Sequence, residues 1–134
     1  VEGNYLYRYD LTTGKYHGKV HIRPVPQWQQ GVFYVDGKIL ITADDGDADF
    51  NETDNIYVVD VADLGKTSAY VELFKECKEF LLAGEIEGLS MDPVNDDLLV
   101  LSNRGSRIVL GMVKGFYPGY DKEHHDLYIY ERIK

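Results

Sequence analysis

Apolar and polar residues alternate along short segments of the chain, and Gly, Pro, Asn and Asp separate these segments. A period of two residues is typical of a β-strand with one face toward a core and the other toward water. Many of the eleven Tyr and five Phe lie in these segments beside Val, Ile and Leu, a composition that strands favour. The pattern therefore predicts an all-β fold. The predicted strands cover residues 5–11, 16–22, 31–35, 38–43, 56–61, 69–75, 86–93, 97–102 and 127–133.

Two glycine-containing turns predict antiparallel hairpins. Gly14 lies in the turn between the first two strands, where a positive φ is easily adopted. Asp36-Gly37, a strong hairpin dipeptide, joins the third and fourth strands.

The secondary structure of two stretches stays undecided. Residues 68–83 fit both helical and strand spacing, and we expect a strand over 69–75 followed by a short helical or irregular turn. Residues 108–110 are either a short strand or a helical turn.

A repeat links the middle of the chain to its final third. Gln30-Gly31-Val32 corresponds to Glu87-Gly88-Leu89, and each is followed by a turn, a second apolar strand and a polar segment. A Tyr-containing strand comes later in both copies, at 55–60 and at 126–131. Residues 4–10 belong to the same class of strand. The repeated unit has the size of a propeller blade with long loops.

On these segments the chain resembles a β-propeller, and it is most similar to the NHL-repeat, strictosidine-synthase-like and gluconolactonase-like types. In those families, a strand that starts with Glu or Gln, Gly and an apolar residue opens each blade near the central axis. Here the matching segments are Gln30–Asp36 and Glu87–Pro93. The resemblance implies antiparallel four-stranded blades and a single propeller-like segment over residues 1–134.

The nine predicted strands group as a hairpin, then four strands, then three. A blade has four strands, and a closed ring needs about four blades or more. The predicted fold is thus an incomplete propeller. We favour a segment of a longer propeller; the alternatives are a ring completed by copies of the chain and an open stack of sheets. Unpaired blade edges would promote self-association.

Charge narrows the possible partners. The chain has 14 Lys and Arg against 23 Asp and Glu, a net charge of −9 with His neutral. This charge repels nucleic acid and disfavours anionic membranes. No apolar run approaches the ~20 residues of a membrane span. Cys77 is the single cysteine, so no intrachain disulfide ties the chain to an oxidising compartment. The compartment stays open, with an extracellular or periplasmic one slightly favoured.

An acidic loop after the fourth strand is the clearest candidate for chemistry. Asp45, Asp47 and Asp49 match the start of an EF-hand loop, and Ca²⁺ accepts 6–8 such oxygen ligands. The match then fails, because Phe50 stands where Gly is needed and Ile56 where a bidentate Glu is needed. The segment is therefore not an EF-hand. It is either a solvated acidic loop or a different kind of Ca²⁺ site.

The resemblance implies a second metal position. In gluconolactonase-like propellers, carboxylate and Asn side chains near the axis bind a divalent metal, and Glu87 and Asn103 match such positions loosely. The alternative for Glu87 is a local cap or a pair with Arg104. The adjacent His124 and His125 are expected to be a surface pair, since neighbouring strand residues point to opposite faces.

Three weaker candidates have plain structural alternatives. His17 and His21 share a strand face but have no third metal ligand nearby. Cys77 is expected to be a buried structural thiol. The aromatic loop at 111–119 either contacts a ligand or packs as a flap.

The sequence therefore predicts a propeller-type module that binds a small molecule or a protein and has no complete catalytic site of its own. The alternative is part of a calcium-dependent propeller hydrolase, of the lactonase or phosphoesterase type. There, Glu87 or Asn103 would hold a metal that polarises the substrate and activates water. A third possibility is a structural repeat segment. Whether the chain is an enzyme stays open.

Overall fold

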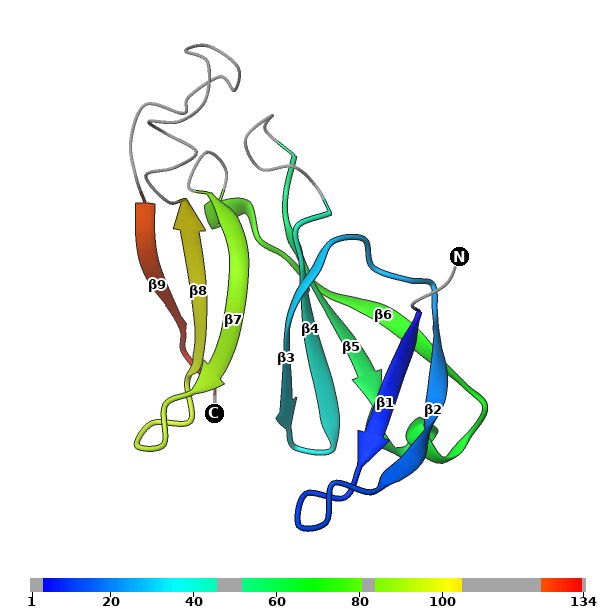
Figure 1. The fold of residues 1–134 in the computed structure, drawn as a ribbon. Helices are drawn as coiled ribbons and strands as arrows, with labels where there is room; N and C mark the ends of the chain where they lie inside the picture. The colour runs from blue at the N-terminus through cyan, green and yellow to red at the C-terminus, as the bar shows by residue number, and fades with distance from the viewer. Residues whose placement is uncertain (1–3, 46–51, 81–83, 105–123, 134) are drawn as a thin grey trace.

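The computed structural model describes residues 4–45, 52–80, 84–104 and 124–133. It is all-β, as predicted, and its strands follow the predicted grouping of two, four and three (Figure 1). Two short 3-10 helices, η2 (Val61–Gly65) and η3 (Lys78–Phe80), flank the sixth strand. The strands are β1 (Tyr5–Tyr9), β2 (Tyr16–Arg23), β3 (Gln29–Val35), β4 (Lys38–Ala43), β5 (Asn55–Asp60), β6 (Ser68–Glu76), β7 (Glu85–Met91), β8 (Leu98–Arg104) and β9 (His124–Tyr130).

Strands β3 to β6 form a four-stranded antiparallel meander, which we call the first meander. Each strand pairs with the next one in the sequence. The predicted turn joins β3 to β4, and Asp36 and Gly37 both have positive φ, 47° and 76°. Two successive positive φ values are required by the tight turns that suit hairpin twist.

Strands β7 to β9 form a second, three-stranded antiparallel meander, the second meander. Gly31 of β3 and Gly88 of β7 lie at the same stage of the two meanders, and a β-bulge interrupts the ladder beside each of them. The two glycines that the sequence pattern aligns therefore lie beside similar irregularities in the two ladders.

The β1–β2 hairpin pairs in a way that the repeat does not predict. Its second strand runs parallel to β6, with His21–Arg23 opposite Ser68–Tyr70. The rest of β6 pairs with β5, so β6 bends from one partner to the other and joins hairpin and meander into a curled six-stranded sheet. The outer edge of a meander exposes N–H and C=O groups, and β2 supplies partners for part of this edge.

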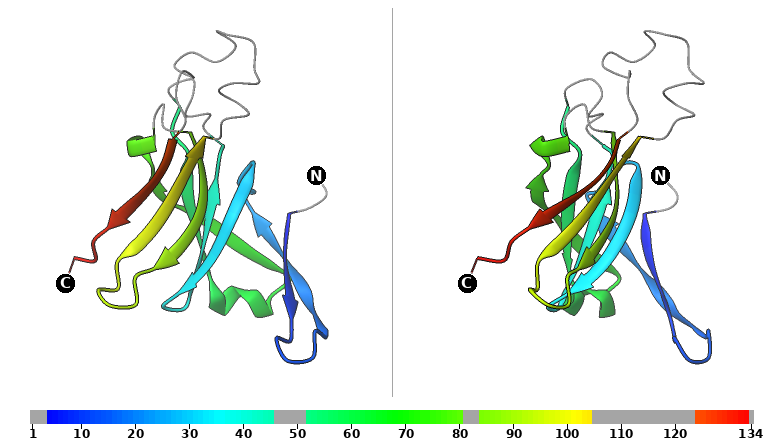
Figure 2. Two further views of the ribbon diagram at one scale, coloured as in Figure 1. Left: turned by 60° about the vertical axis from the view of Figure 1, so that its left-hand side comes forward. Right: turned by 90° about the vertical axis from the view of Figure 1, so that its left-hand side faces the viewer.

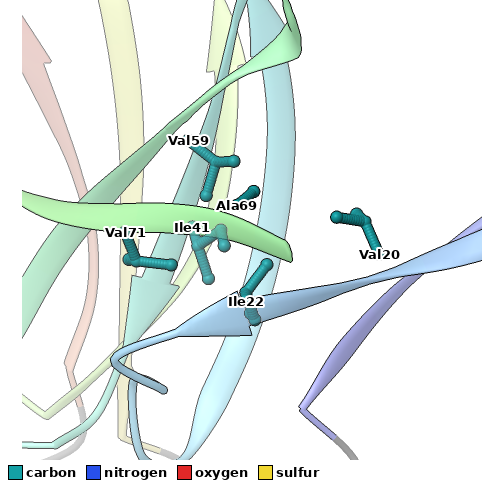
Figure 3. Close-up of a cluster of buried hydrophobic side chains, with 6 residues drawn as sticks. All are labelled: Val20, Ile22, Ile41, Val59, Ala69 and Val71. Atoms are coloured by element: carbon teal, nitrogen blue, oxygen red, sulfur yellow. The ribbon is translucent and has the colours of Figure 1, made fainter. Parts of the chain in front are cut away.

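The hairpin, the first meander and the second meander lie one after another as three layers (Figures 1 and 2). A buried cluster of Val20, Ile22, Ile41, Val59, Ala69 and Val71 holds the hairpin on the first meander (Figure 3). A second cluster of Leu40, Ile56, Cys77, Ile86 and Val100 lies between the two meanders. The first meander is thus covered on both faces, which explains why four consecutive residues of β4 are buried.

Residues 68–80 confirm the expected strand and short helical turn, as β6 and η3. The helical stripe that competed with this interpretation is not a core face, because Leu73 and Phe74 are each 53% exposed. The open prediction at 108–110 falls outside the described residues. No helix in the described part of the chain has the length and apolar character needed to cross a membrane.

Candidate functional site

The acidic loop begins where β4 ends, and Asp45 is its one predicted metal ligand within the described residues. Its carboxylate accepts hydrogen bonds from the Asn55 amide, at 2.9 Å, and from the Tyr57 hydroxyl. Burial, and then the hydrogen bond and charge of Asp45, raise the pKa of Tyr57 to about 12. Asp45 is therefore held by two donors from β5. Asp47 and Asp49 lie outside the described residues.

Asp54, at the far end of the same loop, is fully buried and links three segments. Its carboxylate accepts the backbone N–H of Ile86 at 3.0 Å, and its carbonyl accepts the N–H of Cys77 at 2.9 Å. Asp54 belongs to the acidic loop by sequence, but its contacts are those of a buried joint between β6 and β7.

The two residues suggested by the gluconolactonase resemblance do not lie opposite each other. The register pairs Asn103 with Glu85, whereas Glu87 falls in the bulge between Ile86 and Leu89. The carbonyl oxygen of Glu87 accepts a hydrogen bond from the Thr42 hydroxyl. Within residues 4–45, 52–80, 84–104 and 124–133, no group of three or more His, Cys, Asp and Glu side chains is placed to hold a metal ion.

The remaining predicted candidates have structural surroundings where they are described. His21 packs its ring on Tyr5, with 5.1 Å between ring centroids, while His17 is exposed. Cys77 is fully buried, as predicted, and burial raises the pKa of its thiol to about 12. The side chain of His124, the side chain of Arg104 and the loop at 111–119 lie outside the described part of the structure.

A pocket of about 350 Å³ lies between the two meanders, at the end of the stack where β3 and β7 finish, and we call it the inter-meander pocket. Its lining is mainly apolar. The apolar lining residues are Val35, Leu40, Phe74, Met91, Leu98 and Tyr130. The sequence did not point to this pocket, because its walls come from strand ends that are far apart in the chain.

Four charged residues complete the lining of this pocket: Lys75, Asp96, Glu131 and Arg132. Arg132 donates from Nη2 to Asp36 at 2.6 Å, which ties the end of β9 to the turn after β3. Lys75 Nζ lies 3.0 Å from Glu79 and 4.9 Å from the centre of the Tyr130 ring. Burial, and then the charges of Cys77 and Glu79, raise the pKa of the Tyr130 hydroxyl, which therefore stays protonated.

A comparison of the chain with protein-family models found no match, and neither did searches of curated proteins and of solved structures. The arrangement of the site therefore has to be interpreted from its own chemistry.

Proposed function

We propose that the chain is a propeller-type binding module whose ligand occupies the inter-meander pocket. The observation that supports this most is a concave place with an apolar floor and a rim of four charged residues, Lys75, Asp96, Glu131 and Arg132. A volume of about 350 Å³ lies in the range of small-molecule sites, which are mostly apolar with a few oriented polar groups. Because the rim has both signs of charge, we expect a compact, flat, apolar ligand, and Arg132 is the group through which a carboxylate on it would bind.

Arg132 is the group we expect to select the carboxylate. A guanidinium has five N–H donors, and the contact with Asp36 uses one nitrogen of Arg132. The remaining donors can form a charge-assisted bond with an anionic ligand. Tyr130 would pack on the apolar part of the ligand, with Lys75 beside its ring.

The propeller assignment within this proposal is supported by two features. The first meander has the strand order of a blade, and the second repeats its first three strands. The Gly that opens each predicted blade lies where β3 and β7 approach each other. We retain the resemblance to NHL-repeat and gluconolactonase-like propellers as part of the proposal. The calcium-dependent hydrolase stays the alternative.

Binding of 2-naphthoate, followed by calorimetry or NMR titration, tests the pocket. Met91→Trp fills the space between the meanders and should abolish binding. Val94→Trp adds the same side chain at a position that is 84% exposed and should leave binding unchanged. Arg132→Gln should weaken binding of 2-naphthoate by about tenfold and leave neutral 2-naphthalenemethanol unaffected, since bonds to charged groups contribute about 1.5–3 kcal/mol. Equal binding by wild type and Met91→Trp would exclude this site.

A further inference from the structure

The two meanders correspond residue by residue, which makes their faces comparable. Ile41 of β4 lies opposite Tyr57 of β5, and Val100 of β8 lies opposite Tyr128 of β9. Both pairs lie on the face that receives the preceding layer: Tyr57 packs against the hairpin cluster and Tyr128 against the cluster between the meanders. Residues that alternate with them lie on the other face, which points to the following layer.

The described residues cover this second face in the first meander and leave it uncovered in the second. The fully buried Thr42 corresponds to Leu101, which is 42% exposed. The fully buried Ile56 corresponds to Leu127, which is 58% exposed. Ile129 continues the same row of β9 and is 60% exposed. These three apolar residues therefore form an uncovered surface, the tail face, where the repeat has a buried one.

The repeated glycines have the same difference. A Cβ on Gly31 would lie 2.7 Å from the carbonyl oxygen of Glu87, because β7 packs directly over this position. A Cβ on Gly88 would have nothing within 4 Å. Gly88 thus lies on the tail face. The space beside it is open, whereas the equivalent space beside Gly31 is filled by β7.

The opposite end of the stack carries an aromatic surface, the head face. In the hairpin, Leu6 packs toward the first meander, and the alternating Tyr5 and Tyr7 lie on the other face. Their rings are 6.2 Å apart, and Lys19 Nζ lies 4.0 Å from the centre of the Tyr5 ring. Tyr7 is 54% exposed. Tyr5 lies on the face that points away from the following layer, and Tyr57 and Tyr128 lie on the equivalent faces of the two meanders, where each packs on a preceding layer.

We propose that the tail face of one copy of this chain binds the head face of a second copy. The chain contains both halves of such an interface. Leu101, Leu127 and Ile129 correspond to the surface on which the second meander packs within one copy, and Tyr5 lies on the face of the hairpin that is equivalent to the face of Tyr128. Two different faces of one chain form a head-to-tail contact, which closes a ring when the rotation allows it. The described residues of two copies contain eighteen strands, enough for about four blades of four strands, the smallest number in closed propellers.

Mass measurement by light scattering or sedimentation, over a concentration series, tests this inference. Wild type should reach twice the mass of one chain. Leu127→Glu on the tail face and Tyr7→Glu on the head face should each be monomeric, because each change places a charge in an apolar contact. Val94→Glu and Tyr34→Glu, at exposed positions outside both faces, should keep the wild-type mass. Circular dichroism and melting curves confirm that each variant is folded.

Mixing the two monomeric variants distinguishes the geometry. Leu127→Glu keeps an intact head face and Tyr7→Glu an intact tail face, so the mixture should form a one-to-one dimer. A tail-to-tail dimer would instead leave Tyr7→Glu dimeric by itself, and this result would overturn the proposal. Wild type that stays monomeric at every concentration would also overturn it. Neither result bears on ligand binding, because the inter-meander pocket opens between the layers and not on the outer faces.

Discussion

The hydroxyl of Thr42 donates a hydrogen bond of 2.5 Å to the carbonyl oxygen of Glu87, and it accepts one of 2.7 Å from the N–H of Gly31. Thr42 is fully buried, so neither bond is exchanged with water. One side chain of the first meander thereby joins β3 to β7, the first strand of the second meander. This bridge fixes the distance between the layers at the place where the repeated glycines lie.

Thr42→Val should destabilise the fold without changing its shape. Valine has nearly the same size but leaves the Gly31 N–H and the Glu87 carbonyl without the Thr42 partner, which costs about 1–3 kcal/mol for a buried group. Chemical denaturation of the variant measures this loss. Thr67→Val, at an exposed position, is the matched control. Equal free energies of unfolding for the two variants would show that the bridge contributes nothing.

Gly31→Ala should lower the free energy of unfolding of the monomeric chain, and Gly88→Ala should raise it. The new methyl group at position 31 meets the Glu87 backbone at 2.7 Å, and such overpacking costs about 1–3 kcal/mol. At position 88 the methyl group enters open space, and alanine in a strand is about 0.5–1 kcal/mol more favourable than glycine. Denaturation at low protein concentration separates the two. A stable Gly31→Ala would mean that β3 and β7 are farther apart than described.

The sequence predicted the strands well because their signals are local. Alternation and the Asp36-Gly37 turn depend on neighbouring residues, and so β3 and β4 formed where expected. Side chains from distant segments determine the pocket and the joints. Asp54 lies in an acidic loop by sequence, yet its carboxylate accepts a hydrogen bond from Ile86, more than thirty residues away. The parallel pairing of β2 with β6 also had no local signal, since it depends on which edge the folded meander leaves free.

Stability should fall in alkaline solution through Tyr57. Its pKa in the folded state is about 12 against 10 for an ordinary tyrosine, mainly because burial and the Asp45 carboxylate disfavour the phenolate. The protonated form thus stabilises the fold fully below pH 10, and this contribution is lost as pH rises from 10 toward 12. The free energy of unfolding should fall more steeply with pH in the wild type than in Tyr57→Phe. The difference in slope is at most about 1.4 kcal/mol per pH unit for one proton. Parallel slopes would contradict the assignment.

Cys77 should resist thiol reagents until the chain unfolds. The thiol is fully buried and its pKa is raised to about 12 by burial, so little thiolate is present at pH 8. Reaction with a disulfide reagent should be slow in buffer and complete in denaturant. Cys77→Ala should leave no reaction in either condition and should cost stability, because it opens a cavity beside Leu40 and Ile86. Rapid labelling of the folded chain would show that β6 opens locally.

Calcium binding to the acidic loop is the prediction that separates the binding module from the hydrolase. An ion bound only to the folded chain raises the melting temperature, by the equivalent of about 2.7 kcal/mol at a hundredfold excess over the dissociation constant. If Asp45, Asp47 and Asp49 hold the ion, Ca²⁺ should raise the melting temperature and a chelator should reverse the rise. The double variant Asp47→Asn/Asp49→Asn should show no rise. A site at Glu87 and Asn103 requires that Glu87→Gln remove it instead. A melting temperature that changes with neither calcium nor chelator would exclude both sites and therefore also the calcium-dependent hydrolase.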